Sequence, residues 1–202
     1  MTTSGVLSDQ KVKLLAPGFG GFTGVLSPLS SAGGVVFPYT PTIQISHSAN
    51  YGSYDMTHSV YQQNYFINTN NPSISLTGTF TAQTKSEAQY SAAALHFFKS
   101  ATKPDFGATS NNPGVPPGVL MLSAYGALHA RNVPVIVKSF SYALPEDSDY
   151  LTFDLPVIGR SSIPSIFIVS IELTTQYTPT KVRNGFSLRN YKSGLGLNRG
   201  FM

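Results

Sequence analysis

Histidine and carboxylate side chains are the groups in this chain best suited to metal or acid–base chemistry, because the sequence contains no cysteine. The four histidines stand at positions His47, His58, His96 and His129. None of them has the His-x-x-x-His or His-Glu spacing that places two ligands on one face of a helix. The sequence therefore predicts no metal site and no bound cofactor.

Acidic residues form one cluster, at Glu146, Asp147, Asp149 and Asp154. Paired carboxylates can hydrolyse a glycosidic bond, but these four lie in one short segment after a proline, where acidic side chains are usually solvated. A serine triad is recognised by geometry rather than by counting, and the chain has no Gly-x-Ser-x-Gly turn and no Gly-Lys-Ser/Thr phosphate-binding motif. We expect no catalytic residue, and a small hydrolase acting through the acidic cluster is the weaker alternative.

The C-terminal segment is basic. No acidic residue follows Glu172, whereas five basic residues do. Aromatic side chains among them could stack on nucleic acid bases, but five charges are few, and the nearby glycines favour a tail that is mobile until it binds a surface. Docking on protein is therefore favoured over nucleic acid. The acidic cluster and the basic tail are two oppositely charged regions that could meet across a subunit contact. The basic residues after Glu172 are Lys181, Arg183, Arg189, Lys192 and Arg199.

The composition favours assembly. Charged residues make up 11% of the chain, against about 25% in an ordinary soluble domain. A surface with so little charge is typical of proteins that form interfaces with other proteins. The alternative is a monomeric β-protein with a neutral surface. The first 15 residues do not fit a signal peptide, and no apolar run approaches the roughly 18 residues of a membrane span. We therefore expect neither secretion by the usual route nor membrane insertion.

Period-two alternation of apolar and polar residues predicts most of the structure as strands. It is clearest where Ile74, Leu76, Gly78 and Phe80 alternate with serine and threonine. One helix is expected at about residues 85–101, opened by the capping box of Thr84 and Glu87. Further strands are predicted at residues 42–46, 119–122, 133–144 and 166–173, and a long tyrosine-rich hairpin at about 50–66.

This pattern predicts a mainly β fold, a sandwich or open barrel with one flanking α-helix and irregular N- and C-terminal arms. Residues 1–36 are expected to be an irregular N-terminal arm, residues 37–178 the β-domain and residues 179–202 the basic C-terminal tail. The apolar residues of the first segment are too many for a free linker and should lie against a partner. They are Leu14, Leu15, Phe19, Phe22, Val25 and Leu29.

Several segments, taken in order, resemble one family. They are residues 37–43 (Phe-Pro-Tyr-Thr-Pro-Thr-Ile), 46–48, 74–103, 118–126 (Gly-Val-Leu-Met-Leu-Ser-Ala-Tyr-Gly), 133–137, 144–150, 176–179, 186–188 and 193–194. Together they resemble the baseplate and tail-tube initiator proteins of contractile-tailed, T4-like bacteriophages. No single segment is specific for this family, but the order of the segments across residues 37–202 is. Residues 1–36 have little that matches the family.

The resemblance implies a tail-tube-like β-fold and a homo-oligomeric ring, expected to contain six copies, between the baseplate hub and the first tube ring. Other baseplate and tail tube proteins, and the tape-measure protein, would be its partners, with DNA only in transit through the channel. The protein would belong to the virion, and to the host cytoplasm during assembly. A tail tube subunit proper and a carbohydrate-binding β-sandwich that presents exposed tyrosines are the alternatives.

Contacts between subunits are expected from the tyrosine-rich hairpin and from the basic tail. The hairpin would stack on the next ring, and the tail would become ordered on a neighbour. The candidate inter-subunit residues are Tyr51, Tyr54, Tyr61, Tyr65, Lys181, Arg183, Phe186, Leu188, Arg189, Tyr191 and Lys192.

Overall fold

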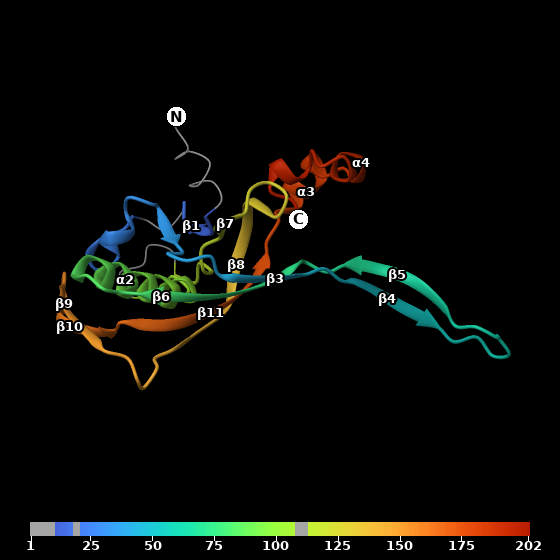
Figure 1. The fold of residues 1–202 in the computed structure, drawn as a ribbon. Helices are drawn as coiled ribbons and strands as arrows, with labels where there is room; N and C mark the ends of the chain where they lie inside the picture. Colours follow the sequence, from blue (N-terminus) through green and yellow to red (C-terminus); the bar gives the residue numbers. More distant parts are fainter. Residues whose placement is uncertain (1–10, 18–20, 108–112) are drawn as a thin grey trace, which may run out of the picture.

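The computed structural model describes residues 11–17, 21–107 and 113–202 and is mainly β, as the sequence predicts. Its central element is one antiparallel sheet in the order β2-β1-β7-β8-β11-β6-β3, which is not closed into a barrel (Figure 1). Strands β2 and β3 are therefore its two margins. The bounds are β1 (Lys13–Leu15), β2 (Gly34–Val36), β3 (Thr42–Ser46), β6 (Ser73–Thr81), β7 (Leu120–Ala124), β8 (Ala130–Ala143) and β11 (Ile166–Thr175).

The neighbouring strands β6 and β11 show why the sheet has one apolar face. They pair antiparallel, with Phe80 opposite Phe167 and Leu76 opposite Ile171. All four of these side chains are buried, and the two phenyl rings stack with centroids 5.5 Å apart. The residues that alternate with these inward positions face outward, so the predicted alternation of apolar and polar positions is confirmed.

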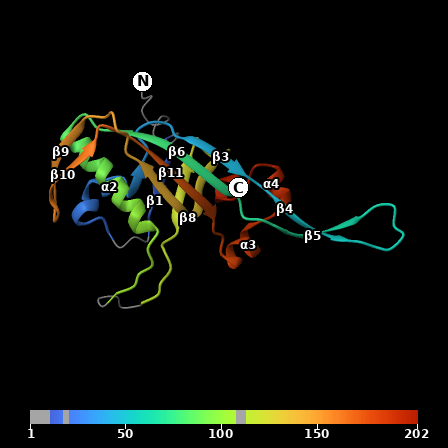
Figure 2. The ribbon, with the colours of Figure 1, turned by 90° about the horizontal axis from the view of Figure 1, so that it is seen from below.

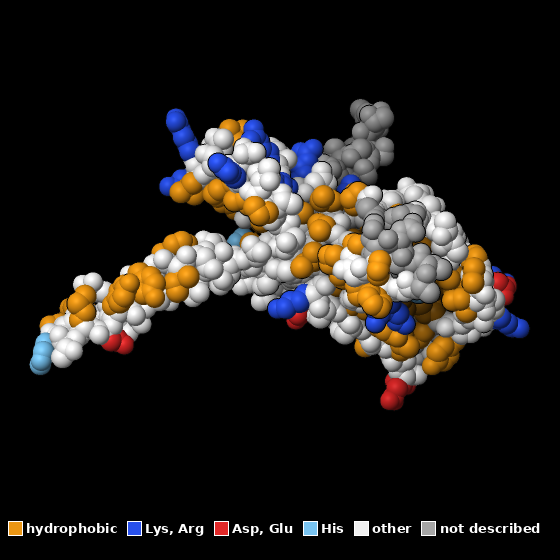
Figure 3. Space-filling model, turned by 180° about the vertical axis from the view of Figure 1, so that it is seen from behind, with side chains coloured by type: hydrophobic (Ala, Val, Ile, Leu, Met, Phe, Trp, Pro, Cys, Tyr) orange, Lys and Arg blue, Asp and Glu red, His pale blue; other side chains and the backbone are white. Residues whose placement is uncertain are grey.

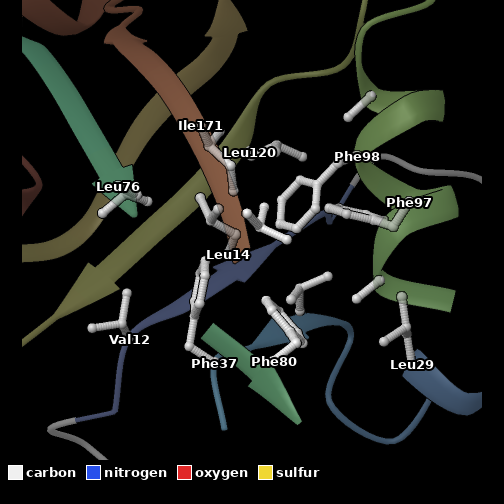
Figure 4. Packing of buried hydrophobic residues seen from close by; sticks show 14 of the residues in the cluster. Val12, Leu14, Leu29, Phe37, Leu76, Phe80, Phe97, Phe98, Leu120 and Ile171 are labelled. Carbon is white, nitrogen blue, oxygen red and sulfur yellow. The ribbon is translucent and has the colours of Figure 1, made fainter. Parts of the chain in front are cut away.

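Helix α2 (Lys85–Ala101) covers the apolar face of the sheet. Its first turn is the predicted capping box: the Glu87 amide donates to the Thr84 hydroxyl, and the Glu87 carboxylate accepts from the Thr84 amide. Figure 4 shows Phe97 and Phe98 pointing from the helix into the core, toward Leu14 and Leu120. Because Phe97 and Phe98 are completely buried, the helix is held mainly by this apolar face.

The described part of the N-terminal segment is not an irregular arm. β1 lies between β2 and β7 within the main sheet, and the 3₁₀ helix η1 (Gly24–Leu29) packs on α2. Leu14 and Leu29 are completely buried in the protein's own core, so the prediction that such residues lie against a partner is wrong for them. The physical reason is that burial against α2 and the sheet already removes these side chains from water. Phe19 lies outside the described residues.

Two hairpins stand apart from the main sheet. One pairs β4 (Ala49–Tyr54) with β5 (Gln63–Thr69), as the tyrosine-rich sequence predicts. The other pairs β9 (Tyr150–Leu155) with β10 (Gly159–Pro164) beside α2, and the sequence reading missed it. Both lie at the ends of the molecule, the first far from α2 and the second next to it (Figures 1 and 2).

The C-terminal segment, residues 179–202, is folded against its own chain and does not need a partner to become ordered. It forms α3 (Pro179–Gly185), α4 (Leu188–Lys192) and the 3₁₀ helix η2 (Leu197–Arg199). Phe201 is buried against Tyr177 with ring centroids 5.3 Å apart, and the Met202 amide donates to the Tyr177 hydroxyl. Because these contacts hold the segment in place, the prediction of a tail that is mobile until it binds a surface is wrong. No helix in the described part of the chain is long and apolar enough to cross a membrane.

Candidate assembly surfaces

The β4–β5 hairpin projects from the body as a two-stranded ribbon (Figures 1 and 2). It continues the β3–β6 pair outward, and the Asn70 amide donates to the Ser48 carbonyl across the junction. Every residue of β5 is exposed. A ribbon of two strands without a core is only marginally stable in water, so this element has the properties of one that another surface completes.

Aromatic side chains lie on both faces of the hairpin. Tyr51 and Phe66 are directly opposite each other on one face, with ring centroids 5.7 Å apart. Tyr54 and Tyr65 lie on the other face, 4.6 Å apart. All four are between 43% and 61% exposed, so the pairs cover each other only in part and leave two apolar surfaces uncovered.

Gly52 determines how the second pair lies. It is directly opposite Tyr65, and a Cβ atom at Gly52 would come within 2.4 Å of the tyrosine ring. The missing side chain therefore allows the ring to lie across the neighbouring strand. This contact orients Tyr65 toward Tyr54.

The outward face of the sheet is rich in hydroxyl groups and poor in charge. Along β6 the outward residues are Ser73, Ser75, Thr77 and Thr79, and the Thr77 and Ser170 hydroxyls lie 3.5 Å apart across to β11. Glu172 and Lys138 line a polar hollow of about 410 Å³ on this face. A neutral surface of this kind suits contact with other molecules without strong charge pairing.

The C-terminal helices bring the predicted tail residues together. Arg183, Phe186, Leu188, Arg189 and Lys192 are exposed on α3, α4 and the turn between them. The surface is therefore both basic and apolar, as Figure 3 shows over this part of the molecule.

Lys181 and Tyr191 contribute to the packing of these helices as well as to their surface. The Lys181 ammonium lies 5.7 Å from the Tyr177 ring centroid and 5.4 Å from that of Phe201, and burial lowers the pKa of Lys181. The Tyr191 ring packs against the Phe186 ring, with the two ring centroids 5.9 Å apart. Both residues are only partly exposed.

A groove that sequence reasoning missed lies between α2, the end of β8 and the β9–β10 hairpin. It has a volume of about 250 Å³ and is mainly apolar, with Leu95, Tyr142, Phe153 and Ile163 among its walls. The alternation of Leu151, Phe153 and Leu155 before the turn at residues 156–158 is a signal that could have predicted the hairpin. The groove itself has no signal of this kind, because its walls come from three separate segments.

The residues suited to chemistry are dispersed. His58 is in the loop at the hairpin tip, His96 is on α2, and His129 packs edge-on to Tyr125 at 5.9 Å. Among the described residues, no three His, Asp or Glu side chains are grouped so that they could hold a metal ion. Glu146, Asp147 and Asp149 are exposed between β8 and β9.

No protein-family model matches the chain, and the search of curated proteins finds no matching sequence. The surfaces that bear on function are therefore the aromatic hairpin, the β3 margin of the sheet, the hydroxyl-rich face and the basic C-terminal helices.

Proposed function

We propose that this chain is a structural, non-catalytic virion protein that forms a ring at the junction of the baseplate hub and the tail tube of a contractile-tailed phage. The ring, with six copies expected, would start tube assembly around a DNA-conducting channel. One observation carries the proposal: the β4–β5 hairpin leaves the body and presents uncovered aromatic side chains on both faces. Within the described residues these side chains remain largely exposed.

The open sheet supports association through its margins. No other described strand pairs with the outer sides of β2 and β3. At β2 the Tyr90 hydroxyl of α2 already bonds both the Val36 amide and the Val36 carbonyl. Unpaired backbone groups at the β3 margin favour pairing with another chain, and closure into a ring limits the number of copies that join in this way. The β3 margin leads directly into the hairpin, so one continuous surface could contact a neighbouring copy.

The hydroxyl-rich face supports the proposed channel. A protein that must let DNA pass should not hold phosphates, since each contact of a basic side chain with a phosphate strengthens binding. The outward face of β6 carries only serine and threonine at its exposed positions, and Lys138 on the same face of the sheet shares its hollow with the carboxylate of Glu172. We place this face toward the channel and the basic C-terminal helices away from it.

Exposed tyrosines also favour a second candidate, a carbohydrate-binding module. Tyr51, Tyr54 and Tyr61 are 61%, 59% and 82% exposed on one projecting element, and aromatic rings of this kind stack on sugars. Glycan binding by the isolated monomer, without any ring, would favour this function over the structural one.

The oligomeric state of the purified full-length chain tests the proposal. Sedimentation velocity over a concentration series, with electron microscopy of the heaviest species, should show closed rings and their copy number. A concentration-independent monomer that also fails to bind purified baseplate and tube proteins would contradict the proposed function.

A double substitution on the hairpin tests the observation that carries the proposal. Tyr51→Ser with Phe66→Ser removes the aromatic pair from one face and should weaken assembly by at least about tenfold, since central aromatic contacts contribute most to interfaces. Phe106→Ser is the matched control, because Phe106 is 79% exposed outside the hairpin. Equal assembly by the double variant and the control would show that this face is not a contact.

A further inference from the structure

We propose that the groove beside α2 binds the α3–α4 surface of a second copy, so that the copies associate head to tail. The contact rests on the proposed self-assembly and identifies which two surfaces meet. The groove side, called here the acidic groove, consists of the walls described above and the adjoining loop of residues 145–149. The other side, called the basic helical surface, consists of the exposed residues of segment 182–195.

The acidic groove has an apolar floor that its own chain leaves accessible. Leu144 and Ile158 line it and remain 52% and 59% exposed. Lys99 also lines it, but its ammonium lies 4.9 Å from the Tyr142 ring centroid and is thus directed along the wall. An inserted apolar side chain would contact Phe153 and Ile163 and would lose its water on binding.

The carboxylates are on a loop whose two ends adjoin this groove, whereas His96 and Lys99 are the basic residues among its lining. Glu146 and Asp147 follow Leu144, which lines it. At the other end of the loop, the Ser165 amide donates to the Asp149 carbonyl at 2.7 Å, next to Pro164 of the groove wall. Both ends of the acidic loop are therefore attached to the groove, and its three carboxylates are exposed beside an apolar floor.

The basic helical surface has the complementary chemistry. Phe186 and Leu188 are 43% and 58% exposed, and Val182 and Leu195 are exposed as well. Arg183, Arg189 and Lys192 are exposed in the same segment. Apolar side chains bordered by cations match an apolar floor bordered by carboxylates, and Arg can pair with a carboxylate through two hydrogen bonds.

The two surfaces lie at opposite ends of the molecule, so one copy cannot bring its own pair together. Figure 1 shows α3 and α4 at the end from which the hairpin projects, whereas β9, β10 and the loop before β9 are at the α2 end. Figure 3 shows basic side chains gathered over the C-terminal helices and acidic side chains at a tip far from them, with further basic side chains on the body between and beyond the two. A contact between two different surfaces of identical chains is heterologous, and it can be repeated until a ring closes.

Charge reversal in the full-length protein tests this contact. Glu146→Lys with Asp147→Lys, and separately Arg183→Glu with Arg189→Glu, should each weaken assembly by at least about tenfold, because like charges then face each other. Combining all four substitutions restores opposite charges and should recover most of the wild-type affinity. Lys85→Glu with Asp105→Lys is the matched control, since both side chains are exposed outside the two surfaces. Sedimentation gives the affinities, and circular dichroism checks folding.

The outcomes separate the contact from the proposed function. Weak assembly of both double variants and its recovery in the quadruple variant would support the contact. If the wild-type protein forms rings and the double variants form them equally well, the contact is wrong and the ring stands. If the wild type never associates, both fail. If Arg183→Glu with Arg189→Glu only abolishes binding to double-stranded DNA, the basic helical surface is a nucleic acid site instead.

Discussion

Gly78 occupies an inward position of β6 where a side chain has no room. A Cβ atom there would lie 2.8 Å from Cδ1 and 2.9 Å from Cε1 of Phe37. Phe37 cannot easily move away, since its ring also packs against Phe80 and Phe98 at 5.6 and 6.5 Å. At this residue the core is determined by a missing side chain as much as by the rings that occupy the space.

We therefore expect Gly78→Ala to destabilise the protein. The free energy of unfolding should fall by about 1–3 kcal/mol, because an added methyl group overpacks the ring cluster. Urea unfolding followed by circular dichroism measures the change. Thr79→Ala is the control, since Thr79 is exposed on the opposite face of the same strand, and it should change stability by less than about 0.5 kcal/mol. A Gly78→Ala protein as stable as the wild type would show that Phe37 can move.

At the scale of elements, α2 shows how a short local motif begins a helix that the core then holds. The Glu87 carboxylate accepts the Gln83 amide at 2.8 Å and the Thr84 amide at 3.3 Å. These hydrogen bonds lower the pKa of Glu87, and the bond from the Gln83 amide has the larger effect. Because the pKa is lower in the folded state, the ionised carboxylate stabilises the fold above the ordinary Glu value of 4.5, and this contribution is lost as the pH falls.

Glu87→Gln should accordingly destabilise the protein at pH 7, and its difference from the wild type should shrink as the pH falls below the ordinary Glu value. Thr84→Ala is the comparison, because it removes the hydroxyl that accepts a hydrogen bond from the Glu87 amide. It should lower the free energy of unfolding by about 1 kcal/mol. The substituted position carries no titrating group. Thermal and urea unfolding at several pH values would measure both. A Glu87→Gln effect that does not change with pH would contradict the role of the charge.

At the scale of the whole molecule, the body and the projecting hairpin have different tasks. The buried core cluster draws on the sheet, α2, η1 and the β9–β10 hairpin, and it includes no residue of segment 47–72. The same segment carries many of the most exposed apolar side chains, among them Val60 at 86% and Tyr61 at 82%. Folding of the monomer thus depends on the body, and association, in our proposals, on the hairpin together with the acidic groove and the basic helical surface.

Replacing residues 49–69 with an Asn-Gly turn tests this division. Ser48 and Asn70 are already joined by a backbone hydrogen bond of 3.0 Å, so a two-residue turn is suited to close the shortened hairpin. The variant should unfold cooperatively with a free energy within about 1 kcal/mol of the wild type, yet associate at least about tenfold more weakly than the wild type in sedimentation. Loss of cooperative unfolding would show that the hairpin belongs to the folding unit, and normal rings would show that it is not the contact.

The sequence alone determined the elements whose causes are local. β6 follows from alternation along residues 73–81, α2 from the capping box at Thr84 and its apolar stripe, and the long hairpin from its tyrosines. In each case the interactions that specify the element lie within a few residues or across one turn.

Only the tertiary structure decided where segments distant in the sequence meet. β1 pairs with β7 through Leu14 and Leu122, which turns an apparently irregular arm into part of the core. Phe201 is buried against Tyr177, which orders a tail that composition alone predicts as mobile. The acidic groove likewise takes its walls from α2, β8 and the β9–β10 hairpin. Burial of apolar surface has no direction along the chain, so local patterns show which residues must be covered but not which segments cover them.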